Sequence, residues 1–527
     1  MKVLVADDVS ELGIRKLSET EGVSITRKTG LSEDELTQEI GDYDALVVRS
    51  QTKVTARVLE AAQRLKVIGR AGVGVDNIDL AAATKKGVIV LNAPDGNTIS
   101  AAEHTFAMLM AVSRHIPQSQ ASIFAGKWDR KSYVGVELRN KTLSIIGMGR
   151  IGAEVAKRAQ AFEMQVLGYD PFLTEERAKE IGVLRVSLDE AIAQADFITV
   201  HTPLTKDTRH LLNDEAFARM KDGVRLVNCA RGGIIDEAAL VRALEMGKVA
   251  GVALDVFEQE PVKPEHPLLQ FKNVVVTPHL GASTVEAQVN VAIDVAEEVG
   301  RVLAGLPFRN AVNLPALSAD QKAVLEPFLE LGEQLGLFAA QLVQGAVSEL
   351  EIVYAGQLAE QNVSFLTRTV LKGLLGYRYS DEVNYVNAPF LAEQAGIVVR
   401  EVRQPKSKVF TNVISLVLKA DDGDHRVVGT LNNGFGPRIV EIDGYSLDVS
   451  PKGNILFTRH VDQPGMIGRI GTLLGDAQVN IAAMQVGRKE SGGQAVMALS
   501  VDKDIPQGVV EEISAVHGIT FVRAIDL

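Results

Sequence analysis

Two long stretches of the chain alternate short apolar runs with amphipathic helical segments, and this pattern restricts the fold more than any other feature. The first stretch fills roughly the first 98 residues, where KVLVAD (2–7) and ALVVRS (45–50) are two of the apolar runs. The second extends from KTLSIIGMGRIG (141–152) to NVVVTPHLG (273–281). Strands joined by crossover helices lie parallel, with helices on both faces of the sheet. The sequence therefore predicts an α/β protein with two Rossmann-like, doubly wound units.

The rest of the chain has a different pattern. With 527 residues it is too long for one hydrophobic core, so several domains are expected. Between about 316 and 452, helices come first and strands with Gly- and Asp-containing turns follow, which predicts a separate α+β domain. Residues 453–527 have the order β-α-β-β-α-β, which is typical of a ferredoxin-like fold.

Charge and cysteine content exclude several classes of function. The formal net charge of −12 argues against a nucleic-acid partner, because phosphate recognition needs clustered cations. The single cysteine excludes an intramolecular disulfide framework and a cysteine-based zinc site, and no metal is predicted. The chain starts with a strand instead of a signal peptide, and no run of about 18 apolar residues follows anywhere. We therefore expect a cytoplasmic protein that does not bind membranes.

A glycine-rich turn opens the second alternating series. Gly147, Gly149 and Gly152 have G-x-G-x-x-G spacing directly after a strand and at the start of a helix, where backbone amides can bind a pyrophosphate. Asp170 ends the next strand, where a carboxylate accepts the ribose hydroxyls of NAD and repels the 2′-phosphate of NADP. The cofactor predicted is NAD. A purely structural turn, and a helix N-cap role for Asp170 before Pro171, are the alternatives.

Three strands of the same series end in polar residues that a core alone does not require. Arg231 follows RLVNCA, Glu260 follows VALDVFEQ, and His279 follows VVVTP. An arginine can bind a carboxylate with two hydrogen bonds, a histidine can transfer a proton, and an acid can orient the histidine. Together they suit hydride transfer from a 2-hydroxy acid. Singly, each has a plain alternative: a surface salt bridge, an exposed loop residue and a capping histidine.

The motifs GMGRIG, NCARGGIIDEAAL, ALDVFEQEP and TPHLGAST resemble those of the D-isomer-specific 2-hydroxyacid dehydrogenases. The resemblance implies that Arg231, Glu260 and His279 are catalytic and that Asp255 binds the nicotinamide carboxamide. It also implies a substrate-binding domain of residues 1–98 plus 284–315, with an NAD-binding domain of residues 99–283. The further NAD contacts that it implies are Arg150, Ile151, Thr202, Cys229, Ala230, Arg231, His279, Leu280, Gly281 and Ala282.

Cations near the N-terminus indicate which hydroxy acid is bound. Arg49, Ser50, Lys53 and Arg70 lie close to the turn formed by Ala71–Gly74, and such a set suits a dianionic group. The alternative for Arg49 and Lys53 is that they only solvate the end of a strand.

These stretches, with APDGNTISAAEHT and GKWDRKSYVG, resemble the members of that family that act on 3-phospho-D-glycerate. The resemblance implies that Asn97 binds substrate with Arg49 and Arg70, and that Arg130 and Lys131 reach a neighbouring subunit. The implied activity is NAD-dependent oxidation of 3-phospho-D-glycerate to 3-phosphooxypyruvate, the first step of L-serine biosynthesis. In long-form members an intervening domain, here 316–452, precedes the last domain.

The last domain has features that suit an amino-acid effector. Asp462 ends a strand and can bind an ammonium group, while the helix that opens after Gly465 can bind a carboxylate. Asn480 begins the next strand and can bind a polar ligand. Residues 453–527 resemble an ACT regulatory domain, which implies L-serine as effector and a homo-oligomer, dimer or tetramer, built by edge-to-edge pairing. A ferredoxin-like domain used only for subunit contact is the alternative.

Two other functions stay open on the sequence alone. A glycerate/hydroxypyruvate reductase, or another D-2-hydroxyacid dehydrogenase, shares the core motifs. A non-enzymatic, NAD-sensing scaffold of the corepressor kind shares the same core but does not need the regulatory tail.

Overall fold

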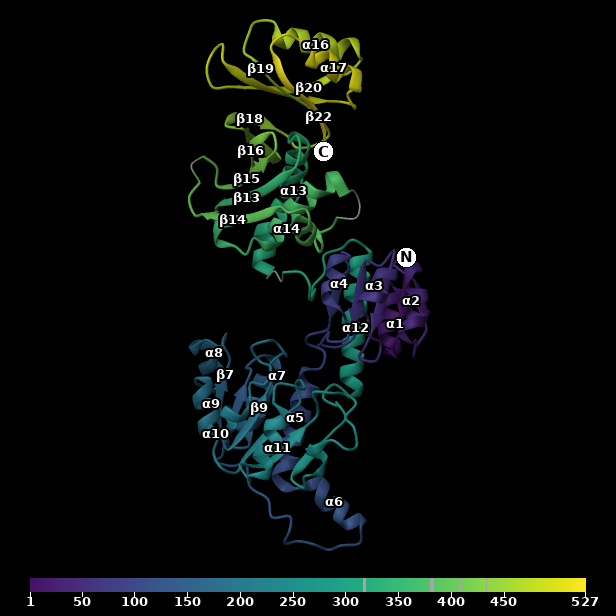
Figure 1. The fold of residues 1–527 in the computed structure, drawn as a ribbon, viewed down its shortest axis with the longest axis vertical. Coiled ribbons are helices and arrows are strands. Elements are labelled where there is room, and N and C mark those ends of the chain that lie inside the picture. The colour runs from purple at the N-terminus through teal and green to yellow at the C-terminus, as the bar shows by residue number, and fades with distance from the viewer. Residues whose placement is uncertain (316–318, 380–382, 408, 433) are drawn as a thin grey trace.

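The computed structural model contains four β-sheets arranged along the long axis of the molecule (Figure 1). It describes residues 1–315, 319–379, 383–407, 409–432 and 434–527. Residues 316–318, where the sequence predicts the boundary to the α+β domain, lie outside the described residues. Over the part of the chain that is described, none of the helices combines the length and apolar character that a membrane crossing needs.

The N-terminal sheet has five parallel strands in the order β2-β1-β3-β4-β5. Its strands are β1 (Lys2–Val5), β2 (Ser24–Arg27), β3 (Ala45–Val48), β4 (Val67–Arg70) and β5 (Ile89–Asn92). The helices on its faces are α1 (Glu11–Ser18), α2 (Glu33–Glu39), α3 (Ala56–Ala61), α4 (Leu80–Lys85) and α12 (Val285–Leu303), with the short 3-10 helix η1 (Ile40–Asp42) after α2. The last of these α-helices, α12, comes from far along the chain, yet its apolar face, including Val295 and Val299, lies in the core of this sheet.

The second sheet has seven parallel strands in the order β12-β11-β10-β9-β6-β7-β8. They are β6 (Thr142–Ile146), β7 (Gln165–Tyr169), β8 (Leu184–Arg185), β9 (Phe197–Val200), β10 (Val224–Asn228), β11 (Val249–Leu254) and β12 (Val274–Val276). Its helices are α5 (Thr98–Arg114), α6 (Ile116–Phe124), α7 (Arg150–Ala161), α8 (Glu175–Glu180), α9 (Leu188–Gln194), α10 (Asp214–Arg219), α11 (Glu237–Glu245) and the 3-10 helix η2 (Pro267–Gln270). The strand order reverses between β6 and β9, and such a switch point is where α/β sheets bind ligands.

The chain passes twice between these two sheets. It enters the second sheet through α5 and returns through α12, and the two crossings are joined by a 2.7 Å hydrogen bond between the hydroxyls of Ser100 and Thr284. The two crossings therefore lie side by side, and the carboxyl ends of the two sheets face each other across a region here called the cleft, which the Arg231–Asp76 contact spans.

The third sheet is mixed, in the order β14-β13-β15-β16-β17-β18, and only β13 and β14 are parallel. Its elements are α13 (Ala319–Leu342), β13 (Val347–Gly356), η3 (Gln357–Glu360), α14 (Ser364–Tyr379), α15 (Ala388–Gln394), β14 (Val398–Gln404), β15 (Asn412–Ala420), β16 (Gly423–Asn432), β17 (Gly436–Ile442) and β18 (Tyr445–Val449).

The fourth sheet is antiparallel, in the order β20-β21-β19-β22. Its elements are β19 (Asn454–Val461), α16 (Met466–Asp476), β20 (Ile481–Arg488), β21 (Gln494–Val501), α17 (Gln507–Ser514) and β22 (Ile519–Asp526). One face packs on α16 and α17. The other face supplies Phe457, Val496 and Ile525 to the same core cluster that α13 and β13 build, so the third and fourth sheets share one hydrophobic core.

The predicted fold class is confirmed, and the order of the last domain is as predicted. Several elements were not predicted individually, among them β2, α2, α4 and α6. β2 and α2 have few buried residues, so their apolar pattern is weak. α6 begins directly after His115, whose φ of 51° interrupts the helical backbone at the end of α5.

Candidate active site

His279 and Glu260 are hydrogen-bonded to each other at the carboxyl edge of the second sheet. The Nδ1 atom of His279 lies 2.8 Å from a Glu260 carboxylate oxygen, and the other carboxylate oxygen accepts a 3.0 Å hydrogen bond from the backbone N–H of Phe257. Partial burial works against ionisation of Glu260, but the bonds from His279 and Phe257 keep the pKa of this carboxyl below its usual value. The imidazole is half exposed, so its other nitrogen is available to a ligand.

Arg231 lies on the loop after β10, next to the loops that carry Glu260 and His279, because β10, β11 and β12 are neighbours in the sheet. Its Nε donates a 3.0 Å hydrogen bond to Asp76, which belongs to the N-terminal part of the chain. A Cβ placed on Gly74 would lie 1.9 Å from an Arg231 nitrogen, so the guanidinium rests on the glycine backbone. Arg231 therefore reaches across the cleft between the two sheets.

The glycine turn between β6 and α7 leaves its backbone accessible. Gly147 has φ of 100°, and a Cβ there would lie 2.6 Å from the carbonyl oxygen of His201. A Cβ on Gly152 would lie 2.1 Å from the carbonyl oxygen of Gly147, so both positions exclude larger residues. Around Gly149, at the start of α7, nothing lies within 4 Å of the corresponding position. This open backbone at a helix N-terminus suits a pyrophosphate.

Other predicted NAD contacts surround this turn. Arg150 pairs with Asp95 at 2.5 Å, while Ile151 is partly buried against the core below the turn. The buried hydroxyl of Thr202 has no hydrogen-bond partner among the described residues, so a ligand can still bind it.

Asp170 shapes the glycine turn from the end of β7. One carboxylate oxygen accepts a 2.9 Å bond from the backbone N–H of Met148, and the other accepts a 2.8 Å bond from that of Phe172. The alternative role as a helix N-cap is wrong, because Thr174 caps α8. The carboxylate remains half-buried at the rim, where it also has lone pairs for ribose hydroxyls.

Asp255 organises the segment that carries His279. Its buried carboxylate accepts bonds from the N–H groups of Leu280 at 2.7 Å and Gly281 at 2.8 Å, and from the Thr277 hydroxyl at 2.6 Å. The Nε2 atom of His104, on α5, lies 3.1 Å away. Burial opposes the ionisation of Asp255, but the bonds from His104, Thr277 and Leu280 keep its pKa below the usual value.

Cys229, Ala230 and Ala282 complete the predicted NAD set. Cys229 and Ala230 lie in the β10–α11 loop, and Ala282 follows Gly281 toward α12. Burial raises the pKa of the Cys229 thiol, with Asp255 nearby acting in the same direction, so the thiol stays protonated near neutral pH. Its interpretation as a small apolar residue instead of a nucleophile agrees with this environment.

The predicted substrate cations differ in their surroundings. Burial and the neighbouring Arg231 lower the pKa of Arg70 to about 10, and its Nε has no hydrogen-bond partner among the described residues. The buried side-chain oxygen of Asn97 also has no hydrogen-bond partner among the described residues. Arg49 donates to the backbone carbonyl of Asp8, and Ser50 is exposed next to it.

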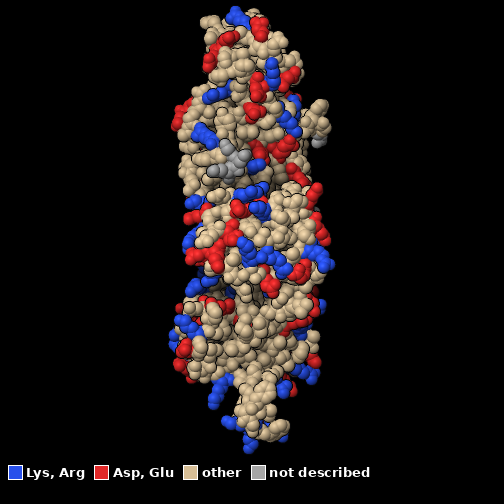
Figure 2. Space-filling model, turned by 90° about the vertical axis from the view of Figure 1, so that its right-hand side faces the viewer, with Lys and Arg blue, Asp and Glu red and all other residues tan. Residues whose placement is uncertain are grey.

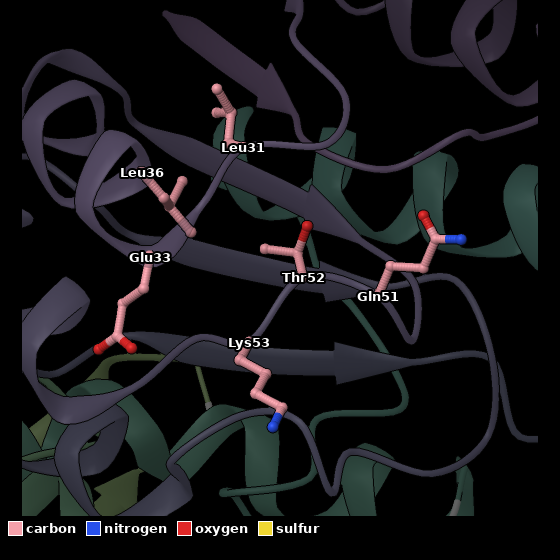
Figure 3. Close-up of a pocket in the computed structure, with 6 residues that line it drawn as sticks. All are labelled: Leu31, Glu33, Leu36, Gln51, Thr52 and Lys53. Carbon is pink, nitrogen blue, oxygen red and sulfur yellow. The ribbon is translucent and has the colours of Figure 1, made fainter. Parts of the chain in front are cut away.

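Lys53 faces a different site from the other cations. It lines a small hollow beside α2, with Glu33, Gln51 and Thr52 among its neighbours (Figure 3). None of the predicted catalytic residues lines this hollow. Arg130 and Lys131 are exposed on the loop after α6, far along the chain from the cleft residues.

The predicted effector residues are not brought together within one chain. Asp462 pairs with Arg488 at 3.2 Å, and Gly465, with φ of 86°, precedes α16. Asn480 lies beyond the other end of this 11-residue helix, where its amide donates to Asp502 at 2.8 Å. One protomer therefore offers two half-sites instead of one complete site.

Comparison with known proteins decides the family. Residues 106–281 match the model of the D-isomer specific 2-hydroxyacid dehydrogenase NAD binding domain, 324–443 that of the D-3-phosphoglycerate dehydrogenase intervening domain, and 454–518 that of the ACT domain. The D-3-phosphoglycerate dehydrogenase of Bacillus subtilis (strain 168) is 49% identical over 526 residues, which cover 100% of this chain and 99% of that protein. The chain belongs to the D-3-phosphoglycerate dehydrogenase family.

Further similarities agree with this family. The D-3-phosphoglycerate dehydrogenase of Archaeoglobus fulgidus is 47% identical and covers 100% of both chains. Among solved structures, the TT0316 protein from Thermus thermophilus is 36% identical with a TM-score of 0.55, and it covers 59% of this chain and 100% of its own. A D-lactate dehydrogenase from Aquifex aeolicus, complexed with NAD and lactic acid, is 31% identical with a TM-score of 0.52 over 58% of this chain and 96% of its own.

Membership of the D-3-phosphoglycerate dehydrogenase family confirms that this protein is an NAD-dependent oxidoreductase. The open backbone at Gly149 and the partnerless Thr202 hydroxyl fit this cofactor. Sequence reasoning missed Asp76, His104 and Thr277. The signal for Asp76 was its place in the turn GVGVDN beside the cations, but nothing in the sequence indicates that α5 lies next to Asp255.

Proposed function

We propose that this enzyme oxidises 3-phospho-D-glycerate to 3-phosphooxypyruvate with NAD, the first step of L-serine biosynthesis. The proposal rests on Arg70. Its guanidinium is buried beside Arg231, which lies on the opposite side of the cleft, and its Nε has no hydrogen-bond partner among the described residues. Three guanidinium groups, those of Arg49, Arg70 and Arg231, suit a substrate with a carboxylate at one end and a phosphate at the other. Asn97, Ser50 and the Thr98 hydroxyl, which has no hydrogen-bond partner among the described residues, would add polar contacts.

His279 acts as the base in the proposed reaction. Glu260 holds Nδ1, so Nε2 is the nitrogen that takes the proton from the C2 hydroxyl as the C2–O bond becomes a carbonyl. When bound, NAD would supply the acceptor for the hydride from C2, and the residues at the carboxyl edge of the second sheet would hold it. Glu260 stabilises the imidazolium that results, and Arg231 exchanges Asp76 for the substrate carboxylate and polarises the forming carbonyl.

The remaining assignments follow from this reaction. Residues 1–98 and 284–315 bind substrate, 99–283 bind NAD, 316–452 form the intervening part and 453–527 the regulatory part. Gly147, Gly149, Gly152, Arg150 and Ile151 bind the pyrophosphate side of NAD, and Asp170 binds the ribose. Thr202 and the loops Cys229–Arg231 and His279–Ala282 bind the nicotinamide side, with Asp255 either binding the carboxamide or orienting the loop.

A single cysteine suits a reducing compartment, so the proposed location is the cytoplasm.

A two-substrate assay tests the proposal. NADH formation is followed with 3-phospho-D-glycerate and with unphosphorylated D-glycerate. We expect kcat/KM to be at least about a hundredfold higher for the phosphorylated substrate, since a charge-assisted contact is worth roughly 1.5–3 kcal/mol and more than one is lost. Equal values would contradict the phosphate assignment and would favour a glycerate/hydroxypyruvate reductase.

We propose that L-serine inhibits the enzyme at a site built from two copies of the fourth sheet. β20 is an edge strand with exposed Met484 and Val486. Asn480 precedes the start of β20, and Asp462 pairs with Arg488 at its end. Antiparallel pairing of two β20 strands about a two-fold axis would therefore place the Asn480 of one copy beside the Asp462 and Gly465 of the other.

A second apolar surface supports a homo-oligomer. The arm formed by α6 and the loop after it projects from the end of the molecule, and Figure 2 shows Lys and Arg at the margins of this end around an uncharged middle. Phe124 and Trp128 on the arm are 82% and 83% exposed, which is unusual for large apolar side chains in a lone protomer.

Two measurements test these regulatory proposals. Asp462→Ala is expected to raise the serine concentration needed for half inhibition at least about tenfold, while turnover without serine stays near that of the wild type. Sedimentation of wild type and of Val486→Lys is expected to show a smaller assembly for the variant. Wild-type inhibition in Asp462→Ala would contradict the effector site, and a monomeric wild type would contradict the assembly.

A further inference from the structure

Three metal-ligating side chains converge beside the nicotinamide end of the cleft. They are His104 of α5, Cys229 after β10 and Asp255 after β11, and each offers one ligand atom within 4.8 Å of the other two. The proposed reaction uses neither the imidazole of His104 nor the thiol of Cys229. The sequence predicted no metal site because one cysteine cannot make a cysteine-rich zinc site. A mixed site needs only one thiolate, which Cys229 would become by releasing its thiol proton to solvent as the ion binds.

The ligand types match a thiophilic divalent cation. Zn²⁺ takes nitrogen, sulfur and carboxylate oxygen together, and three protein ligands leave a fourth position open. The 3.1 Å separation between His104 Nε2 and Asp255 Oδ1 is close to the roughly 3.3 Å expected between two ligand atoms about 2.0 Å from a tetrahedral ion. An ion can therefore bind both atoms without a large movement of either side chain.

Neighbouring groups already orient the ligands. The N–H groups of Leu280 and Gly281 and the Thr277 hydroxyl fix the Asp255 carboxylate, as the outer contacts of protein metal sites do. The Asp255 side chain is fully buried, whereas that of His104 is 19% exposed, so the ion would enter from the His104 side.

We propose that His104, Cys229 and Asp255 bind Zn²⁺ and that the bound ion excludes the nicotinamide of NAD, which makes Zn²⁺ an inhibitor competitive with the cofactor. The binding stands on the three side chains alone. The competition also rests on the proposed placement of Cys229 and Asp255 at the nicotinamide.

Metal binding is measured on the full-length enzyme without cofactor or substrate. Zn²⁺ affinity is followed by calorimetry, and Co²⁺ is added separately as a spectroscopic probe, because a tetrahedral Co²⁺–thiolate site gives a near-ultraviolet charge-transfer band and strong visible bands. We expect one ion per chain. Cys229→Ser is expected to weaken Zn²⁺ binding at least about tenfold and to abolish the charge-transfer band, because it replaces a soft ligand with a hard one.

Two further variants complete the test. His104→Gln is expected to weaken Zn²⁺ binding at least about tenfold as well, whereas His517→Gln, which removes an exposed histidine of the last domain, should leave it unchanged. Circular dichroism verifies the fold of each variant, and Cys229→Ala replaces Cys229→Ser where that variant does not fold. Wild-type affinity in both cluster variants, or a Co²⁺ spectrum without a thiolate band, would overturn the site.

Competition is measured separately. NADH is expected to raise the apparent Kd for Zn²⁺ in proportion to its concentration, and Zn²⁺ is expected to raise the KM for NAD without lowering kcat. If NADH leaves Zn²⁺ binding unchanged, the proposed competition is wrong, whereas the metal site itself stands. If the metal-free enzyme shows no preference for 3-phospho-D-glycerate, only the proposed reaction is contradicted. The metal site and the competition are unaffected, because neither binding measurement uses that substrate.

Discussion

His279 is positioned by two carboxylates that act on different atoms. Glu260 binds the imidazole Nδ1, while Asp255 binds the backbone N–H groups of the two residues that follow His279. The first contact fixes the ring and its tautomer, and the second fixes the turn, in which His279 itself has φ of 57°. Burial opposes ionisation of both acids, but hydrogen bonds from His104 and Thr277 lower the pKa of Asp255 and those from His279 and Phe257 lower the pKa of Glu260, so both remain ionised at neutral pH. The base is therefore oriented before substrate binds.

Glu260→Gln tests the first of these contacts. The amide keeps the shape of the side chain but cannot balance an imidazolium, so we expect kcat to fall by about tenfold to a hundredfold with little change in the KM for NAD. Steady-state kinetics measures both constants. Glu258→Gln, two residues earlier, is the matched control and should retain kcat within about twofold. A normal kcat in Glu260→Gln would remove this acid from the mechanism.

Arg70 tests the binding of the dianionic end of the substrate. Its guanidinium is buried and partnerless at Nε, so the wild-type enzyme already bears the cost of desolvating it. Arg70→Gln removes the charge, and we expect KM for 3-phospho-D-glycerate to rise about tenfold to a hundredfold, equivalent to roughly 1.5–3 kcal/mol, with KM for NAD unchanged. A rise in both KM values would indicate that Arg70 stabilises the fold around the cleft and does not bind the substrate.

At the scale of elements, the third and fourth sheets belong to one folding unit. Phe457 of β19 is fully buried and lies edge-on to Phe338 of α13 at 6.4 Å between ring centroids, and to Phe521 of β22 at 6.2 Å. The same residue thus fills the core beneath both sheets. Burial of such a ring stabilises both parts together, so neither sheet is expected to unfold first.

Phe457→Ala tests this shared core. We expect a loss of about 3–5 kcal/mol in the free energy of unfolding, because the cavity lies between two elements that cannot close on it. Denaturant unfolding, followed by circular dichroism and by proteolysis across residues 319–527, should show one transition for both sheets. Ile467→Ala, on the exposed side of α16, is the control and should cost less than about 0.5 kcal/mol. Separate transitions would contradict the shared unit.

The junction between these sheets also contains a pH-dependent cluster. His425 of β16 is 4% exposed and lies between Asp422 and Asp443, and Arg459 of β19 pairs with Asp443. The Asp443 carboxylate, 3.7 Å from Nδ1, raises the pKa of His425 above its usual 6.5. Burial opposes ionisation of Asp443, but the neighbouring His425 and the bond from the Arg426 backbone keep its pKa below the usual 3.8.

The pH dependence of stability follows from the directions of these two pKa shifts. The contribution of His425 is complete below pH 6.5 and is lost as pH rises through its raised folded-state pKa, whereas that of Asp443 is complete above pH 3.8 and is lost as pH falls through its lowered pKa. We expect the wild type to lose stability above pH 6.5 relative to His425→Gln, by about 1–2 kcal/mol. Parallel curves of unfolding free energy against pH for the two proteins would contradict this.

The elements that could be predicted from sequence are those with strong periodicity and clear boundaries. The glycine turn and the three strand ends that carry Arg231, Glu260 and His279 follow from local pattern, because parallel strands place their carboxyl ends at one edge. The pairing of Arg231 with Asp76 and of His104 with Asp255 could not be predicted, since each joins segments more than 100 residues apart. The shared core of the last two sheets was missed for the same reason, because β19 shows only a buried strand in sequence.

At the scale of the whole molecule, residues of the third sheet's unit contact the N-terminal unit beside α15. The Asn384 amide, just before α15, donates a 2.8 Å hydrogen bond to the carbonyl of Gly87, which follows α4, and Lys85 lies 5.9 Å from the ring centre of Phe390. Because the third and fourth sheets share a core, an effector-induced movement of the last sheet would carry the third sheet with it. We therefore expect the contact at Gly87 to pass such a movement on to the sheet that holds Arg70.

Asn384→Asp tests this transmission. Aspartate retains the side-chain oxygen that accepts bonds from the backbone of Val386 and Asn387, but it loses the donor to Gly87 and places a negative charge beside that carbonyl. We expect turnover without serine to stay within about twofold of the wild type, while half inhibition needs at least about fivefold more serine, a coupling loss of roughly 1 kcal/mol. Asn362→Asp, elsewhere in the same part, is the control. Unchanged serine titration in Asn384→Asp, with serine binding shown by calorimetry to be intact, would mean that the signal passes through the chain connection to α13 and not through Gly87.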